Sequence, residues 1–95
     1  MNNLAITSGY KILKALGNKK RIQILYALYN EEMSVGELEK IVDLSQSALS
    51  QHLAVLRKED IVKTRRNAQV IFYSIKNPLV SKILEVLIEF YDTYN

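Results

Sequence analysis

The chain of 95 residues contains no cysteine, no tryptophan, one proline and three glycines. Without cysteine it has no disulfide, no thiolate metal site, no iron–sulfur cluster and no thiol redox centre. Its only histidine, His52, leaves too few ligands for an ordinary zinc site. No apolar run approaches the roughly 18–20 residues that cross a bilayer, and the N-terminus lacks the features of a signal peptide. We therefore expect a soluble cytoplasmic protein that uses no metal, no cofactor and no membrane.

The residues that are present have the composition of a folded domain, with 48% hydrophobic and 24% charged side chains. Two domains would leave each too short for its own core, so residues 1–95 are predicted to form one domain. The net charge of +3 alternates along the chain: residues 1–30 and 45–76 are basic, whereas 31–44 and 77–95 are acidic. Such alternation suits a polyanionic partner, but ordinary solvated surfaces also show it.

Apolar spacing predicts a mainly α fold with one small β-hairpin, in the order α-α-α-α-β-β-α. Ser34 and Glu37 form a capping box at the start of the third helix, and Ser45 caps the fourth. Pro78 lies in the first turn of the last helix, where its missing N–H costs little. β-branched and aromatic residues flank a polar tip at 66–69, which is typical of a hairpin. The expected helices cover residues 4–16, 20–29, 35–42, 46–59 and 78–94, and the expected strands cover 61–65 and 70–75.

The third and fourth helices, joined by a few residues, make a helix-turn-helix. Leu49, Leu53 and Leu56 face inward in the second of them, so short polar side chains point outward near its start. Hydroxyls and amides hydrogen-bond base edges and phosphates, although they are also common solvent-facing residues. For His52 two alternatives stay open, a DNA-facing side chain and a half-buried imidazole bonded within the motif. The candidate DNA-binding residues of this helix are Gln46, Ser47, Ser50, Gln51, His52, Arg57 and Lys58.

The hairpin adds a second basic feature, because Lys63, Arg65 and Arg66 crowd its turn. Arginine enters minor grooves and clamps phosphates bidentately, whereas a purely structural role would be to protect an edge strand. A basic hairpin directly after a helix-turn-helix is the winged form of that motif. Together the two features predict binding of double-stranded DNA.

The last helix has more apolar side chains than one core uses. Ten of the sixteen residues 79–94 are apolar or aromatic, whereas a surface helix needs about three to four in seven. The surplus predicts a homodimer through the first and last helices. The alternative is that two apolar faces of the last helix pack on two sides of the same domain. A two-fold dimer also suits a pseudo-palindromic DNA site, with recognition helices roughly 34 Å apart. The expected interface residues are Leu4, Ile6, Tyr10, Leu13, Ile83, Leu84, Leu87 and Tyr91.

The segments 34–38, 44–53 and 56–62 resemble the ArsR/SmtB family of bacterial winged-helix repressors, and 64–73 is similar to its HlyU/BigR-like branch. The resemblance implies a homodimer that binds operator DNA and releases it on a signal. It also implies recognition-helix roles for Gln46, Ser47, Ser50, Gln51 and His52, and wing roles for Arg65 and Arg66. Asp60 departs from the family, which has glycine there, and aspartate tolerates the left-handed conformation better than most residues.

The resemblance also implies where a sensor would lie. Some relatives sense metals through cysteines at a position that Met33 occupies here. Others use Asp, His and Glu along the last helix, and the HlyU/BigR-like branch pairs two cysteines at positions matching Tyr26 and Asp92. We therefore expect neither metal nor thiol sensing. The residues at the last-helix metal positions are Asn77, Leu79, Phe90 and Thr93.

No enzyme motif is present, and Ser47 and His52 lie on different helix faces, which makes them a poor nucleophile–base pair. The sequence therefore predicts a DNA-binding transcriptional regulator, a repressor or anti-silencer. The alternative is a protein-interaction module of the same fold that pairs with another regulator and binds DNA weakly or not at all.

Overall fold

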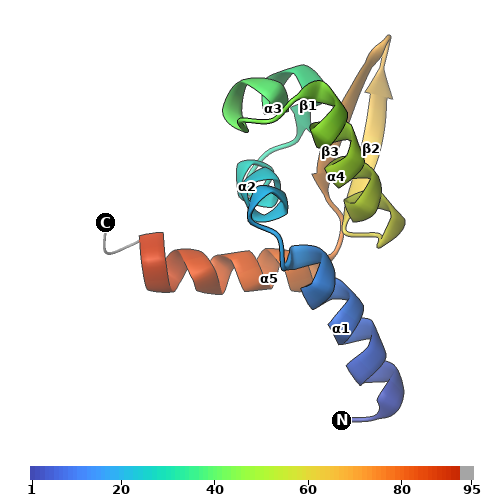
Figure 1. The fold of residues 1–95 in the computed structure, drawn as a ribbon, viewed down its shortest axis with the longest axis vertical. Coiled ribbons are helices and arrows are strands. Elements are labelled where there is room, and N and C mark those ends of the chain that lie inside the picture. Colours follow the sequence, from blue (N-terminus) through green and yellow to red (C-terminus); the bar gives the residue numbers. More distant parts are fainter. Residues whose placement is uncertain (93–95) are drawn as a thin grey trace.

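Residues 1–92 are described in the computed structural model, and they form five α-helices, a short π-helix and a three-stranded sheet (Figure 1). This arrangement confirms the predicted order of helices and hairpin and adds one short strand. Thr93 and Tyr94, which the sequence assigned to the last helix, lie outside the described residues. The elements are α1 (Asn3–Leu16), α2 (Lys19–Ala27), β1 (Met33–Ser34), α3 (Val35–Ile41), α4 (Gln46–Lys58), β2 (Val62–Asn67), β3 (Val70–Ile75), α5 (Pro78–Leu87) and the π-helix η1 (Ile88–Asp92).

The helices begin where short polar side chains bind their free N–H groups. Ser34 Oγ accepts the Glu37 N–H at 3.1 Å, and Glu37 Oε1 accepts the Ser34 N–H at 2.9 Å, so the predicted capping box is confirmed. The Ser45 hydroxyl accepts the Ala48 N–H at 3.1 Å and starts α4 as predicted. Each cap satisfies donors that a helix end otherwise leaves without a partner.

The core lies between α2, α3, α4, α5 and one face of the sheet. Leu49, Leu53 and Leu56 are buried, as their spacing predicted, and they fix which face of α4 points outward. By contrast α1 contributes only its C-terminal half, through Ile12, Ala15 and Leu16. Its N-terminal half extends away from the body of the molecule (Figure 1).

The sheet has the order β1-β3-β2, with both pairs antiparallel. Asn67 pairs with Val70, so β2 runs two residues beyond its predicted end and the turn is reduced to two residues. Ala68, the first of these, has φ 56°, a left-handed conformation that tight hairpin turns require. β1 was not predicted, because a strand of two residues has no periodic pattern of its own.

Asp60 lies in the turn between α4 and β2 and has the left-handed conformation, with φ 56°. This is the position where the resemblance led us to expect glycine. Its carboxylate accepts a hydrogen bond from Lys76 Nζ at 3.3 Å, which joins this turn to the residue that follows β3. The backbone geometry expected there is therefore kept without glycine.

Candidate nucleic-acid interface

The polar face of α4 is exposed along its length. Gln46, Ser47, Ser50 and Gln51 all lie on the solvent side, and Arg57 and Lys58 are exposed in the last turn. Because the three core leucines pack on the opposite face of α4, these polar side chains point to solvent and are not needed in the core. This face therefore offers hydroxyls and amides near the helix N-terminus and cations near its C-terminus.

The hairpin lies beside this helix. α4 contacts β2, and the hairpin tip lies at the end of the molecule where α4 begins (Figure 1). A shallow groove of about 390 Å³ runs between them, lined by Ser50 and Arg57 from α4 and by Tyr73 from β3. Helix and hairpin therefore form one continuous surface.

Alternation along β2 separates the three basic wing residues. Val62 is buried and successive strand residues point to opposite faces, so Arg66 shares the α4-facing side with Val62 and Thr64. Lys63 and Arg65 point to the other face. The three basic side chains, predicted to crowd the turn, therefore all lie on β2 but are divided between its two faces.

Arg65 is already occupied by an acidic partner. Its Nε donates to both Glu32 carboxylate oxygens, at 3.0 and 3.1 Å, and a terminal nitrogen donates to Oε1 as well. The guanidinium also lies 4.7 Å from the centre of the Phe72 ring. The hydrogen bonds from Arg65 lower the pKa of Glu32. Sequence reasoning missed Glu32, since it lies 33 positions away and carries no motif. Within residues 1–92, Arg66 and Lys63 form no ion pair.

His52 is half-buried between α4 and α2. Arg21 donates from a terminal nitrogen to His52 Nδ1 at 3.3 Å, and its Nε donates to the carbonyl of Ala15 at 2.6 Å. Arginine has no acceptor atom, so Nδ1 must be unprotonated and the imidazole neutral. Burial, and secondarily the charge of Arg21, lower the pKa of His52. Of the two alternatives, the structure favours the half-buried imidazole, but its partner Arg21 lies on α2 and not within the helix-turn-helix.

The apolar surfaces predicted to form a dimer are mostly uncovered in the single chain. On α1 the exposed fractions are 76% for Leu4 and 61% for Leu13, and Ile6 and Tyr10 are exposed as well. Leu84 is different: only 1% of it is exposed, and with Val80 it packs into the core. Its assignment to the interface is therefore wrong, because α5 uses that face for its own domain. Ile83 packs partly against the core, whereas the following residues of α5 and η1 are exposed: Val86, Leu87, Phe90 and Tyr91.

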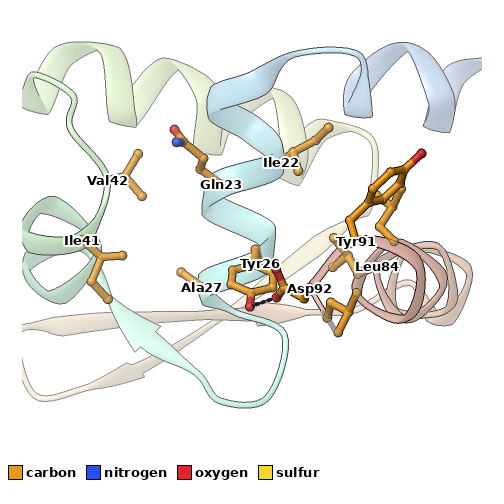
Figure 2. A pocket seen from close by; sticks show the side chains of 11 residues that line it. Ile22, Gln23, Tyr26, Ala27, Ile41, Val42, Leu84, Tyr91 and Asp92 are labelled. Atoms are coloured by element: carbon orange, nitrogen blue, oxygen red, sulfur yellow. Dashed lines mark hydrogen bonds between the residues drawn. The ribbon is translucent and has the colours of Figure 1, made fainter. Parts of the chain in front are cut away.

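The two positions that the resemblance matched to paired cysteines lie in contact. The Tyr26 hydroxyl donates a hydrogen bond to Asp92 Oδ2, joining α2 to η1 (Figure 2). This hydrogen bond raises the pKa of Tyr26. Of the positions matched to metal ligands, Asn77 accepts the Leu79 N–H at 2.9 Å and caps α5, Phe90 is exposed, and Thr93 lies outside the described residues. Within residues 1–92 no group of three His, Asp or Glu side chains is placed to hold a metal ion, and no helix has the length and apolar character to span a membrane.

Comparison with known proteins identifies the family. Residues 18–64 match the model of the bacterial regulatory proteins of the arsR family. The transcriptional activator HlyU of Vibrio cholerae is 49% identical over 80 residues, covering 84% of this chain and 74% of the relative. The chain belongs to the arsR family. The nodulation protein NolR of Rhizobium meliloti is a further member, 51% identical over 90% of this chain and 69% of its own length.

Solved structures of arsR-family proteins agree with this fold. HlyU from Vibrio cholerae superposes with a TM-score of 0.89 at 44% identity, covering 96% of this chain and 98% of that one. The repressor BigR from Xylella fastidiosa gives 0.85 at 33% identity, covering 96% and 97%. The predictions of a winged helix-turn-helix and of a transcriptional regulator are thereby confirmed. The family consists of regulators and not of enzymes, and its named members include both activators and repressors.

Proposed function

We propose that this arsR-family regulator acts as a homodimer that binds a pseudo-palindromic site on double-stranded DNA. In each protomer α4 enters a major groove, where Gln46, Ser50 and Gln51 contact base edges and Ser47 contacts a phosphate. Arg57 and Lys58 contact flanking phosphates at the other end of the helix. The observation that carries the proposal is the exposed polar face of α4 beside the hairpin, on one continuous surface.

In this proposal the wing residues act unequally. Arg66, on the α4-facing side of β2 and without an ion pair in residues 1–92, contacts phosphate or the minor groove. Arg65 and Lys63 reach the backbone only from the opposite face, and Arg65 must first leave Glu32. His52 holds α4 against α2 through Arg21, and this contact gives it a positioning role.

The dimer is proposed to form through α1 and the end of the chain. The exposed apolar residues of α1 (Leu4, Ile6, Tyr10 and Leu13) lie beyond the domain's own core, as do Leu87 and Tyr91. Pairing these faces about a two-fold axis covers both and doubles the DNA-contacting surface. Half-sites one helical turn apart, roughly 34 Å, are the expected target. Because the proposed target is bacterial DNA, we place the protein in the bacterial cytoplasm, on the nucleoid while it is bound.

The test begins with DNA fragments that the protein retains from a random library, followed by fluorescence anisotropy against salt. If the dimer makes about 6–10 phosphate contacts, affinity falls roughly 10³–10⁵-fold between 50 and 200 mM salt. Arg66→Ala is expected to weaken binding to selected and random DNA alike, whereas Gln51→Ala relaxes base preference. Salt-insensitive binding, or no retained DNA together with a complex with another protein, would instead indicate an interaction module. Sedimentation velocity checks the dimer in the same buffers.

A further inference from the structure

A pocket of about 690 Å³ opens between α2, α3 and the C-terminal segment α5–η1 (Figure 2), and no residue of α4, β2 or β3 lines it. Its walls are mainly aliphatic, with Ile22 from α2, Ile41 and Val42 from α3 and its C-cap, and Leu84 and Leu87 from α5. Sites for small organic molecules typically have volumes of about 300–1,000 Å³, apolar walls and a few polar groups. The pocket has the size and the walls of such a site.

The pocket has a single charged group, and its charge is negative. Among the lining residues within 1–92, Asp92 is the only charged side chain, and the uncharged polar ones are Gln23, Tyr26 and Tyr91. Among residues 1–92 the Asp92 carboxylate has a single hydrogen-bond partner, the Tyr26 hydroxyl on Oδ2, and forms no ion pair. The second carboxylate oxygen can therefore accept a further hydrogen bond, and it lies beside an apolar wall. A protonated amine is the group that would use both the charge and the acceptor.

We propose that this pocket binds a small organic cation, with an aliphatic or aromatic body against the aliphatic walls and one protonated amine at Asp92. The amine donates to the Asp92 carboxylate, whose Oδ2 already accepts from Tyr26. The bound molecule therefore joins α2 and α3 to η1. None of the residues proposed to contact DNA lines the pocket, whereas two residues of the proposed dimer interface, Leu87 and Tyr91, lie on its rim, so the dimer must leave the opening at Asp92 uncovered. The site is therefore independent of the DNA interface in composition.

The experiment uses the full chain and three probes with one body: 4-phenylbutylamine, 4-phenylbutanol and 4-phenylbutyrate. Binding is followed by amide chemical-shift changes at neutral pH. The amine is expected to bind saturably, with the largest shifts at Ile22, Ala27 and Leu87, and the carboxylate at least about tenfold more weakly. Asp92→Asn should weaken amine binding by about tenfold or more and remove the preference, because it deletes a charge-assisted hydrogen bond.

Glu89→Gln is the matched control, since it removes one charge from the same short helix at an exposed position outside the pocket. It should leave amine binding unchanged. Equal binding of all three probes, or an equal effect of both variants, would overturn the proposal in favour of an unselective apolar groove. Amine binding that strengthens as the protein is diluted into monomers would also overturn it, because a second copy of the chain would then be the occupant.

Discussion

The contact between Glu32 and Arg65 predicts a variant that binds DNA more tightly than the natural chain. In Glu32→Gln the carboxylate that accepts three hydrogen bonds from the guanidinium is replaced by a neutral amide. Arg65 keeps its stacking contact with Phe72 but loses its ionic partner. The freed guanidinium is then available to a phosphate near the hairpin.

The size of the effect follows from counterion release. Each cation that neutralises one phosphate adds about 0.9 to the slope of log affinity against log salt concentration. One Arg65 from each protomer of a dimer therefore makes the slope steeper by about 1.8. Over a fourfold change, from 50 to 200 mM salt, this corresponds to an additional loss of about 12-fold, with the gain in affinity appearing at the low-salt end.

The assay is fluorescence anisotropy on one selected DNA fragment at five salt concentrations. Glu31→Gln is the control, because Glu31 is an exposed neighbour with no ion pair among residues 1–92 and its replacement changes the net charge equally. Glu32→Gln must also be measured in an Arg65→Gln background, where it should have no more effect than the control. If both glutamate variants steepen the slope equally, or if the effect survives without Arg65, the gain is long-range charge and the reasoning is wrong.

The remaining predictions concern stability and assembly. Leu84→Ala should lower the free energy of unfolding by about 2–5 kcal/mol in urea titrations, because Leu84 is buried. Leu13→Ala should change the free energy of unfolding of the monomer by less than about 0.5 kcal/mol but weaken the dimer in sedimentation. If Leu84→Ala weakened only the dimer and Leu13→Ala only the monomer, the assignments of Leu84 to the core and of Leu13 to the interface would both be rejected. Folding lowers the pKa of His52 below its usual 6.5, so the unfolded chain binds the proton more tightly. Stability should therefore fall as pH drops from about 6.5 towards the folded value, and His52→Gln should remove that component of the pH profile. Asp60→Gly should raise stability by up to about 1 kcal/mol in thermal unfolding, since glycine adopts φ 56° freely, and a loss would show that the contact with Lys76 outweighs backbone strain.

Features encoded by neighbouring residues could be predicted from the sequence. The capping box at Ser34, the inward leucines of α4 and the start of α5 at Pro78 depend on spacings of three or four residues, and the structure has all of them. Four predicted helix ends agree with the structure, and five others differ by one or two residues, because local signals are weakest at helix ends.

Features that depend on distant residues could not be predicted. Glu32 reaches Arg65 only because β1 brings the start of α3 beside the hairpin, and Arg21 reaches His52 only because α2 packs on α4. The same limit explains Leu84, whose burial is decided by which face of α5 meets the core. A helix with apolar residues on several faces does not reveal by itself which one is used.

Ser34 belongs to two structures at once, since it caps α3 and pairs with Phe72 in the sheet. The first turn of the helix-turn-helix and the central strand of the wing are thus joined at a single residue, without a linker between them. The position of the hairpin relative to the start of the helix-turn-helix is consequently set by the fold itself. Little conformational freedom remains to be lost on binding, so changes in hairpin length should alter how far the wing reaches and not the direction in which it points.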